Sequence, residues 1–320
     1  MFIPYARQSI SEDDIAAVTK VLRSDFLTQG PTVPAFERAL TIYCKATHAV
    51  AMNSATSALH VACLALGVGP GDIVWTSPIS FVASANCALY CGAEVDFVDI
   101  DSQTFNMSVD ALATKLACAE LEGTLPKVVI PVHLAGQSCD MAQIHKLAQK
   151  YDFKIIEDAS HAVGGTYNGS PVGSCLYSDI TVLSFHPVKI ITSGEGGMAL
   201  TNNPQLAELM FRLRSHGITR DKNLFQHVSD GPFYYEQIEL GFNYRLTDIA
   251  AALGLSQFQR IDSFVARRNE IARDYDSLFS GSIFTTPTIH DDVISAFHLY
   301  VIRMAFTANQ KQRFFELAHK

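Results

Sequence analysis

The sequence predicts an α/β fold in which a large, mostly parallel sheet is covered by helices and is followed by a smaller α/β domain. The 320 residues exceed the length of one typical domain. Short apolar runs rich in β-branched residues alternate with segments of helical spacing. This alternation stops near residue 248, where long helical stretches begin. We therefore divide the chain into a large domain, residues 1–248, and a small domain, residues 249–320.

Seven apolar runs are predicted as strands of the large domain. Turn-forming Gly, Pro and Asn residues separate several of them from the helical segments. Because helices separate most of these strands in the sequence, we expect parallel pairing. The predicted strands are Ala49–Met52, Ile73–Thr76, Glu94–Val98, Lys127–Pro131, Lys154–Glu157, Ile180–Phe185 and Gly197–Thr201.

Apolar residues at helical spacing predict surface helices at Met141–Tyr151 and Leu206–Arg214. In the small domain we expect a long helix at Arg260–Phe279, a short strand at His298–Ala305 and a final helix at Gln310–Lys320. No further strand follows that could complete a sheet, so the small domain is expected to be incomplete.

Composition excludes several classes of function. A formal charge of −8 argues against a nucleic-acid-binding surface, which needs clustered Lys and Arg. No run approaches the roughly 18 apolar residues that span a bilayer, and the N-terminus lacks a secretory pattern. The seven cysteines are scattered without CxxC spacing, and no histidine has metal-ligand spacing. We therefore expect a cytoplasmic protein without nucleic-acid or membrane partners and without a metal.

The run Lys154-Ile-Ile-Glu-Asp158 ends in two carboxylates. They are Glu157 and Asp158, and because neighbouring residues of a strand face opposite ways, only one can point into a given site. Ligands of open α/β sheets bind at the carboxyl ends of the strands. One of these two carboxylates is therefore a candidate for a functional site.

A second candidate is the segment 53–58, Asn-Ser-Ala-Thr-Ser-Ala, which joins a predicted strand to an apolar helix. Backbone N–H groups and the helix dipole favour a phosphate at such a position. Ordinary capping of the helix by Ser54 or Thr56 explains the same residues equally well.

Lys189 is the third candidate, since it stands between a strand end and the glycine turn Ser193–Gly197. Taken alone, it is most simply an exposed loop lysine. A Schiff-base lysine is the alternative, because its amine must lose a proton readily beside an electrophilic carbonyl. A phosphate cradle, a carboxylate and such a lysine are together what pyridoxal phosphate requires.

Several longer motifs occur in order along the chain and make this combination more specific. They are Leu27-Thr-Gln-Gly30, Asn53-Ser-Ala-Thr-Ser-Ala-Leu59, Ser80-Phe-Val-Ala-Ser-Ala-Asn86, Glu157-Asp-Ala-Ser-His161, Ser184-Phe-His-Pro-Val-Lys189, Gly194-Glu-Gly-Gly197 and Gly241-Phe-Asn-Tyr-Arg-Leu-Thr-Asp248. Through these motifs the chain resembles the sugar-nucleotide aminotransferases of the DegT/DnrJ/EryC1/StrS family from Tyr5 to its last residue. This resemblance implies the type I aspartate aminotransferase fold, pyridoxal 5'-phosphate as cofactor and a homodimer with shared active sites.

The resemblance implies roles for the residues at matching positions. Lys189 is expected to bond the cofactor covalently and to act as acid and base, and Asp158 to pair with the ring nitrogen. The other expected cofactor contacts are Phe81 on the ring face, Thr56, Ser57 and Ser184 at the phosphate, His161 near the ring hydroxyl, and Asn243 at the cofactor of the neighbouring subunit.

Within the family, the runs 24–30 and 214–220 look like the PseC subgroup of pseudaminic acid synthesis. Such enzymes aminate C4 of a UDP-linked 4-keto-6-deoxy-N-acetylhexosamine, and L-glutamate is the expected donor. A lone histidine such as His186 or His216 is otherwise more often structural. The expected substrate contacts are Tyr5, Asp25, Phe26, Leu27, Thr28, His186, His298 and Tyr300.

Three alternatives remain open at this point. One is a 3- or 4-aminotransferase of the same family that acts on a dTDP-linked keto sugar. Another is a dehydratase of the family, but those proteins carry histidine where this chain has Lys189. The third is a non-catalytic regulator that binds pyridoxal phosphate, because a fold alone does not fix function. A regulator could lose the lysine, the aspartate and the phosphate-binding hydroxyls, and this chain retains all of them.

Overall fold

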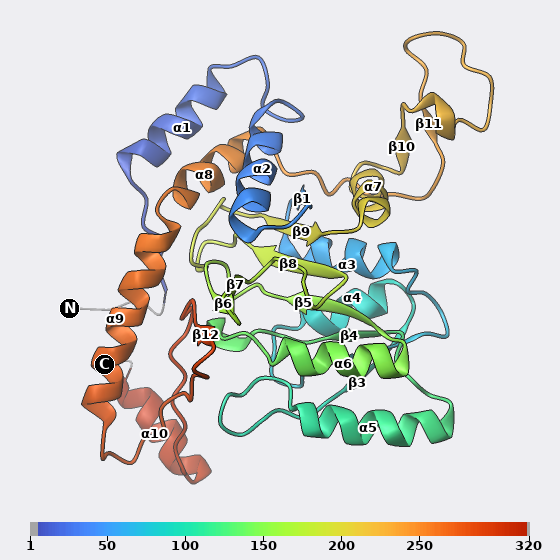
Figure 1. The fold of residues 1–320 in the computed structure, drawn as a ribbon. Coiled ribbons are helices and arrows are strands. Elements are labelled where there is room, and N and C mark those ends of the chain that lie inside the picture. The colour runs from blue at the N-terminus through green and yellow to red at the C-terminus, as the bar shows by residue number, and fades with distance from the viewer. Residues whose placement is uncertain (1–5, 319–320) are drawn as a thin grey trace.

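A seven-stranded sheet forms the centre of the computed structural model, which describes residues 6–318 (Figure 1). All seven predicted strands are present, and no end differs from its predicted position by more than one residue. The strands are β1 His48–Met52, β2 Ile73–Thr76, β3 Glu94–Phe97, β4 Val128–Ile130, β5 Lys154–Asp158, β8 Ile180–Ser184 and β9 Gly197–Thr201, in the spatial order β1-β9-β8-β5-β4-β2-β3.

The sheet is mostly parallel, as predicted, but β9 is an exception. Strands β2, β3, β4, β5 and β8 pair in parallel, whereas β9 is antiparallel to both of its neighbours, β8 and β1. The expected parallel pairing is thus confirmed except in the two strand pairs that involve β9. Residues 185–196 return the chain directly from β8 to β9 without a crossover helix, which only antiparallel strands allow. This returning loop carries Lys189.

Helices cover both faces of the sheet, because strand side chains alternate between them. In β4, Val128 and Ile130 pack into one apolar cluster and Val129 packs into another on the opposite face. The first face is covered by α3 Ala55–Ala65, α4 Ala83–Tyr90 and α7 Pro204–Leu213, and the second by α2 Thr32–Cys44, α5 Val109–Glu122, α6 Met141–Tyr151, α8 Asp248–Phe258 and part of α9 Ile261–Phe279.

The C-terminal part confirms the predicted helices but not the predicted strand. Helix α10 spans Ala308–Ala318, and β12 Val293–Ile294 pairs with β6 Thr166–Tyr167, which also pairs with β7 Ser170–Pro171. The expected strand 298–305 is absent apart from one bridge at Arg303. The Arg268 side chain donates hydrogen bonds to the carbonyl oxygens at positions 297 and 298. These two groups therefore do not pair with another strand. The division of the chain at residue 248 stays a prediction.

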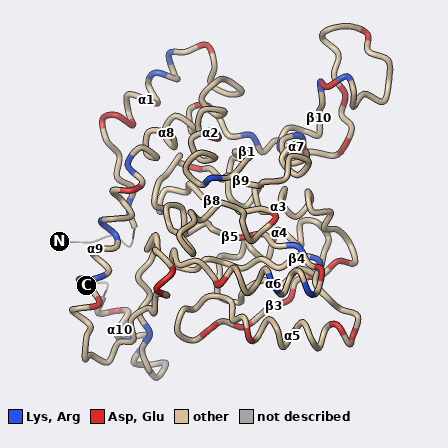
Figure 2. The backbone as a smooth tube through the Cα atoms, in the orientation of Figure 1, with Lys and Arg blue, Asp and Glu red and all other residues tan. Residues whose placement is uncertain are grey.

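Two segments extend from the central body. Helix α1 Glu12–Leu22 packs against α8, and the ribbon of β10 Ile218–Thr219 and β11 Glu236–Gln237 projects from the side that holds α7 (Figure 1). The remaining short elements are the 3₁₀ turns η1 Leu134–Gly136 and η2 Lys222–Leu224. Acidic and basic positions are interspersed over the fold (Figure 2). Among the described residues, no helix has the length and apolar character needed to cross a membrane.

Candidate active site

A cavity of about 610 Å³ lies where the ends of β5 and β8 meet the start of α3. Most of the predicted cofactor residues line it, although they come from four separate segments of the chain. This location is the one expected for a ligand of an open α/β sheet. The predicted residues on its wall are Thr56, Phe81, Asp158, His161, Ser184, His186 and Lys189.

Lys189 enters the cavity from the loop between β8 and β9. Its backbone N–H donates to the carbonyl oxygen of His186 at 2.9 Å. The Ser193 N–H donates to the carbonyl oxygen of Phe185 at 3.0 Å, and this bond joins the two ends of the loop. Burial lowers the pKa of the Lys189 amine to about 8, although the nearby Asp158 carboxylate acts in the opposite direction. A substantial fraction of the amine is therefore neutral near pH 8, as a nucleophilic lysine requires.

Asp158, at the end of β5, is the carboxylate that faces the cavity. Its Oδ2 accepts a hydrogen bond from Ser84 Oγ at 2.6 Å, and its Oδ1 accepts one from the Ser160 N–H at 3.1 Å. Glu157 points the other way and accepts hydrogen bonds from Ser178 and Thr181. The structure thus identifies Asp158 as the carboxylate that faces the cavity, whereas the sequence alone left both carboxylates as candidates.

Ser84, which donates this hydrogen bond to Asp158, was not among the predicted site residues. Ser84 is fully buried in the first turn of α4, behind the cavity wall, and Phe81, which lines the cavity, lies just before that helix. No local signal marks Ser84, because its partner Asp158 lies 74 residues further along the chain.

The start of α3 serves both as a capped helix end and as a candidate phosphate cradle. Ser54 is the N-cap and accepts from Ser57 N–H at 3.1 Å, while the Ser57 hydroxyl donates to Asn53 Oδ1 at 2.5 Å. Ser57 is therefore used in the cap, and this segment contributes residues 53–56 and Leu59 to the cavity wall. The cavity thus meets the positive end of the α3 dipole.

Gly197 permits this arrangement by letting β9 pass close to the start of α3. A Cβ atom at position 197 would overlap the backbone of Ser54 and Ala55. The glycine is thus required for close approach, not for an unusual backbone angle.

Two aromatic residues complete the cavity. Phe81 is 68% exposed despite its apolar ring, which leaves a face free for a flat ligand. His161 Nδ1 accepts from the Ala135 N–H at 3.2 Å, so the proton of the neutral ring resides on Nε2. Burial, followed by the charge of Lys189, lowers the pKa of His161 to about 4. The cavity therefore fits a flat, phosphate-bearing ring with a basic nitrogen, as in pyridoxal phosphate.

The predicted substrate residues do not all reach the cofactor cavity. His298 and Tyr300 line an adjoining cavity, and Tyr5 lies outside the described residues. The segment 25–28 lines neither cavity, and the Leu27 carbonyl accepts from the Asp248 N–H at 3.0 Å. Asn243 is exposed and also lines neither cavity. The roles expected of Asn243 and of the segment 25–28 stay predictions.

Comparison with known proteins fits this geometry. Residues 8–320 match the DegT/DnrJ/EryC1/StrS aminotransferase family. The chain belongs to this family. The aminotransferase is 41% identical over 320 residues to the UDP-4-amino-4,6-dideoxy-N-acetyl-beta-L-altrosamine transaminase of Campylobacter jejuni, covering 99% of this chain and 81% of the relative.

Two solved structures are also similar to this aminotransferase. PseC of Helicobacter pylori, an aminotransferase involved in pseudaminic acid biosynthesis, has a TM-score of 0.86 at 34% identity, over 99% of this chain and 80% of that one. The PLP form of Spr1654 from Streptococcus pneumoniae has a TM-score of 0.87 at 33% identity, over 99% and 82% of the two chains. The expected fold, cofactor and enzyme class are thereby confirmed: the aminotransferase is a pyridoxal-phosphate-dependent sugar transaminase.

Proposed function

We propose that this aminotransferase moves an amino group from L-glutamate to C4 of a UDP-linked 4-keto-6-deoxy-N-acetylhexosamine, as in pseudaminic acid biosynthesis. The observation that carries the chemistry is the Lys189 amine, which lines one cavity with Asp158 and the start of α3. The choice of sugar is supported by the similarity to the Campylobacter transaminase and to PseC.

The residues of the cofactor cavity have distinct tasks in this reaction. When bound, pyridoxal phosphate supplies an electron sink for the carbon that loses its proton. Lys189 then holds or moves that proton, because its lowered pKa of about 8 lets it both accept and donate near neutral pH. Asp158 keeps the ring nitrogen protonated through an ion pair that is strengthened by its burial. The start of α3, with Thr56 and Ser184, binds the phosphate.

The assembly and location are also part of the proposal. We infer a homodimer in which Asn243 of one subunit reaches the cofactor of the other, which is consistent with the exposure of Asn243 at the base of the projecting ribbon. All seven cysteines are free, which suits the reducing cytoplasm.

Cofactor uptake tests the role of Lys189. We expect the purified protein to bind pyridoxal phosphate with a visible absorbance that is lost in Lys189→Ala. Lys154→Ala, which changes an exposed lysine of β5, is the control and keeps the absorbance. A wild-type protein that takes up no pyridoxal phosphate would overturn the assignment.

The substrate needs a separate assay. Purified enzyme with L-glutamate is offered UDP-linked and dTDP-linked keto sugars with the carbonyl at C3 or C4, and the product amine is located by NMR. We expect amination of the UDP-linked 4-keto sugar. Reaction with a dTDP-linked sugar alone would show that the proposed substrate is wrong while leaving the aminotransferase chemistry intact.

A further inference from the structure

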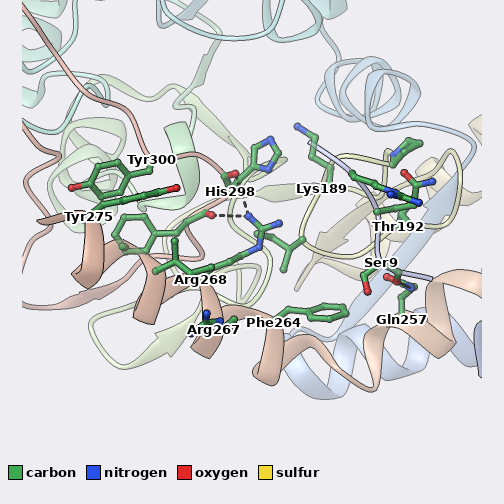
Figure 3. A pocket seen from close by; sticks show the side chains of 17 residues that line it. Ser9, Lys189, Thr192, Gln257, Phe264, Arg267, Arg268, Tyr275, His298 and Tyr300 are labelled. Atoms are coloured by element: carbon green, nitrogen blue, oxygen red, sulfur yellow. Dashed lines mark hydrogen bonds between the residues drawn. The ribbon is translucent and has the colours of Figure 1, made fainter. Parts of the chain in front are cut away.

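A second cavity of about 470 Å³ adjoins the cofactor cavity, and Lys189 lines both. It lies between α9, the loop at 187–192 and the N-terminal segment 7–9 (Figure 3). Within the described part of the chain, its wall contains three arginines as well as Lys189, and no aspartate or glutamate. In a protein of formal charge −8, such a wall is a local concentration of positive charge. We call it the cationic cavity.

Arg268 is the central cation of this cavity. Its Nη1 donates to the carbonyl oxygens of Phe297 and His298, at 2.9 and 3.3 Å. Burial lowers the pKa of Arg268, and no carboxylate among residues 6–318 offsets that effect. A guanidinium has five N–H donors, so Nε and Nη2 stay available to a ligand. Figure 3 shows Arg268 reaching toward His298 in the cavity that Tyr275 and Tyr300 also line.

The neighbours of Arg268 also favour an anionic ligand. The Nδ1 atom of His298 is buried without a partner in the described structure. Burial, with smaller effects from His161 and Lys189, lowers the pKa of His298 to about 2, so this ring adds a polar atom without a charge. Arg7 lines the same cavity and forms no ion pair among residues 6–318. Arg267, by contrast, forms an ion pair with Glu270, in which Nη1 and Oε2 are 2.8 Å apart.

We propose that the cationic cavity binds the anionic oxygens of a substrate as it approaches Lys189, with Arg268 and Arg7 as the ligands. Guanidinium groups pair with carboxylates and phosphates through parallel N–H···O bonds, so both groups suit the site. The inference rests on the proposed function, which supplies two sources of such oxygens: a carboxylate of the amino donor and the diphosphate of the nucleotide sugar. The cofactor phosphate is not a third source, because the start of α3 provides its own cradle.

Calorimetric titration of the holoenzyme with 2-oxoglutarate and, separately, with UDP tests this proposal without measuring turnover. We expect Arg268→Gln and Arg7→Gln each to weaken binding of at least one ligand by about tenfold or more. Arg38→Gln removes an exposed arginine of α2 as a matched control and should leave both affinities unchanged. Arg7→Gln keeps the experiment decisive if Arg268→Gln disturbs the backbone at 297–298.

The outcomes separate the two sources. Weaker binding of 2-oxoglutarate alone assigns the cavity to the donor carboxylate, weaker binding of UDP alone assigns it to the diphosphate, and weaker binding of both assigns it to a shared position. Unchanged affinities in Arg7→Gln and Arg268→Gln, or no binding of either ligand by the wild type, would overturn the proposal. Cofactor absorbance is recorded for every variant, so a failure of the arginine site is distinguished from a failure of the cofactor site.

Discussion

Asp158 and Glu157 are adjacent carboxylates whose surroundings assign them different tasks. Asp158 keeps one face toward the cofactor cavity while Ser84 and Ser160 hold its oxygens. Glu157 is buried, and burial alone would raise its pKa, but hydrogen bonds led by the one from His133 hold that pKa below its usual range. The alternation of side chains along a strand is thus enough to separate a functional acid from a structural one.

At Ser84, removal of one hydroxyl should loosen Asp158 without changing the cavity wall. We expect Ser84→Ala to weaken pyridoxal phosphate binding by about tenfold, because a hydrogen bond to a charged group contributes roughly 1.5–3 kcal/mol. Ser84→Thr should keep most of the affinity. Fluorescence titration of the apoenzyme gives the dissociation constants. The control is Ser80→Ala, which removes a hydroxyl just before α4 that donates to the carbonyl oxygen of Phe81.

A double-mutant cycle shows whether Ser84 acts through Asp158. In the Asp158→Asn background, Ser84→Ala should have little further effect on cofactor affinity. An undiminished tenfold loss there would mean that Ser84 acts on some other group.

The lowered pKa of Lys189 sets the pH dependence of cofactor uptake. The neutral amine attacks the aldehyde, so the rate should be low below pH 8 and should rise through a midpoint of about 8. Because Asp158 raises the pKa of Lys189, Asp158→Asn should shift this midpoint to lower pH. Stopped-flow absorbance over pH 6 to about 11 gives the profile, and a midpoint near the 10.5 of an ordinary lysine would contradict the burial seen here.

At the scale of elements, Asp248 links two distant parts of the chain. It is fully buried at the start of α8 and accepts the N–H groups of Gly30 and Thr32, each at 2.7 Å, at the start of α2. The side chain therefore supplies a cap that the sequence next to α2 lacks, since Pro31 provides none. This long-range cap thus anchors the chain at Gly30 and Thr32 to the start of α8.

Asp248→Ala should lower the free energy of unfolding by about 3 kcal/mol or more, because it leaves buried N–H groups without acceptors. Urea unfolding followed by circular dichroism measures the change. Asp110→Ala, an exposed acid in the first turn of α5, should change stability by less than about 1 kcal/mol. Equal effects of the two substitutions would show that the cap adds nothing beyond ordinary helix charge.

Local patterns predicted the elements well, and long-range contacts explain where they failed. Short apolar runs marked all seven strands of the main sheet, since their pairing partners are themselves apolar. The segment 298–305 has a similar pattern, but its first carbonyl oxygen, that of His298, accepts a hydrogen bond from Arg268, which lies 30 residues earlier in the chain. Ser84 and Arg268 were missed as site residues for the same reason, because their roles depend on partners far away in the sequence.

At the scale of the whole molecule, the two cavities meet at Lys189 and differ in charge. The cofactor cavity contains Asp158 and Glu195, whereas the described wall of the cationic cavity has no acid. A cofactor with a basic ring nitrogen and a substrate with anionic groups therefore each face a wall of complementary charge. Lys189 lies where their reacting atoms would meet.

A shared active site predicts complementation between two defective chains. Lys189→Ala lacks the amine, and Asn243→Asp places a negative charge where we expect the partner's cofactor phosphate, so each variant alone should be nearly inactive. In a mixed dimer, one site combines the intact Lys189 of one subunit with the intact Asn243 of the other, and the second site carries both changes. Random pairing of equal amounts should therefore restore about a quarter of wild-type activity.

The two variants are co-expressed with different affinity tags, and mixed dimers are isolated through both tags, which should raise the recovered activity to about half of wild type per dimer. The control pairs Lys189→Ala with a chain carrying both substitutions, which leaves every site defective. Mixed dimers with no more activity than this control would show that Asn243 serves the site of its own chain, and the active site would then be complete within one subunit.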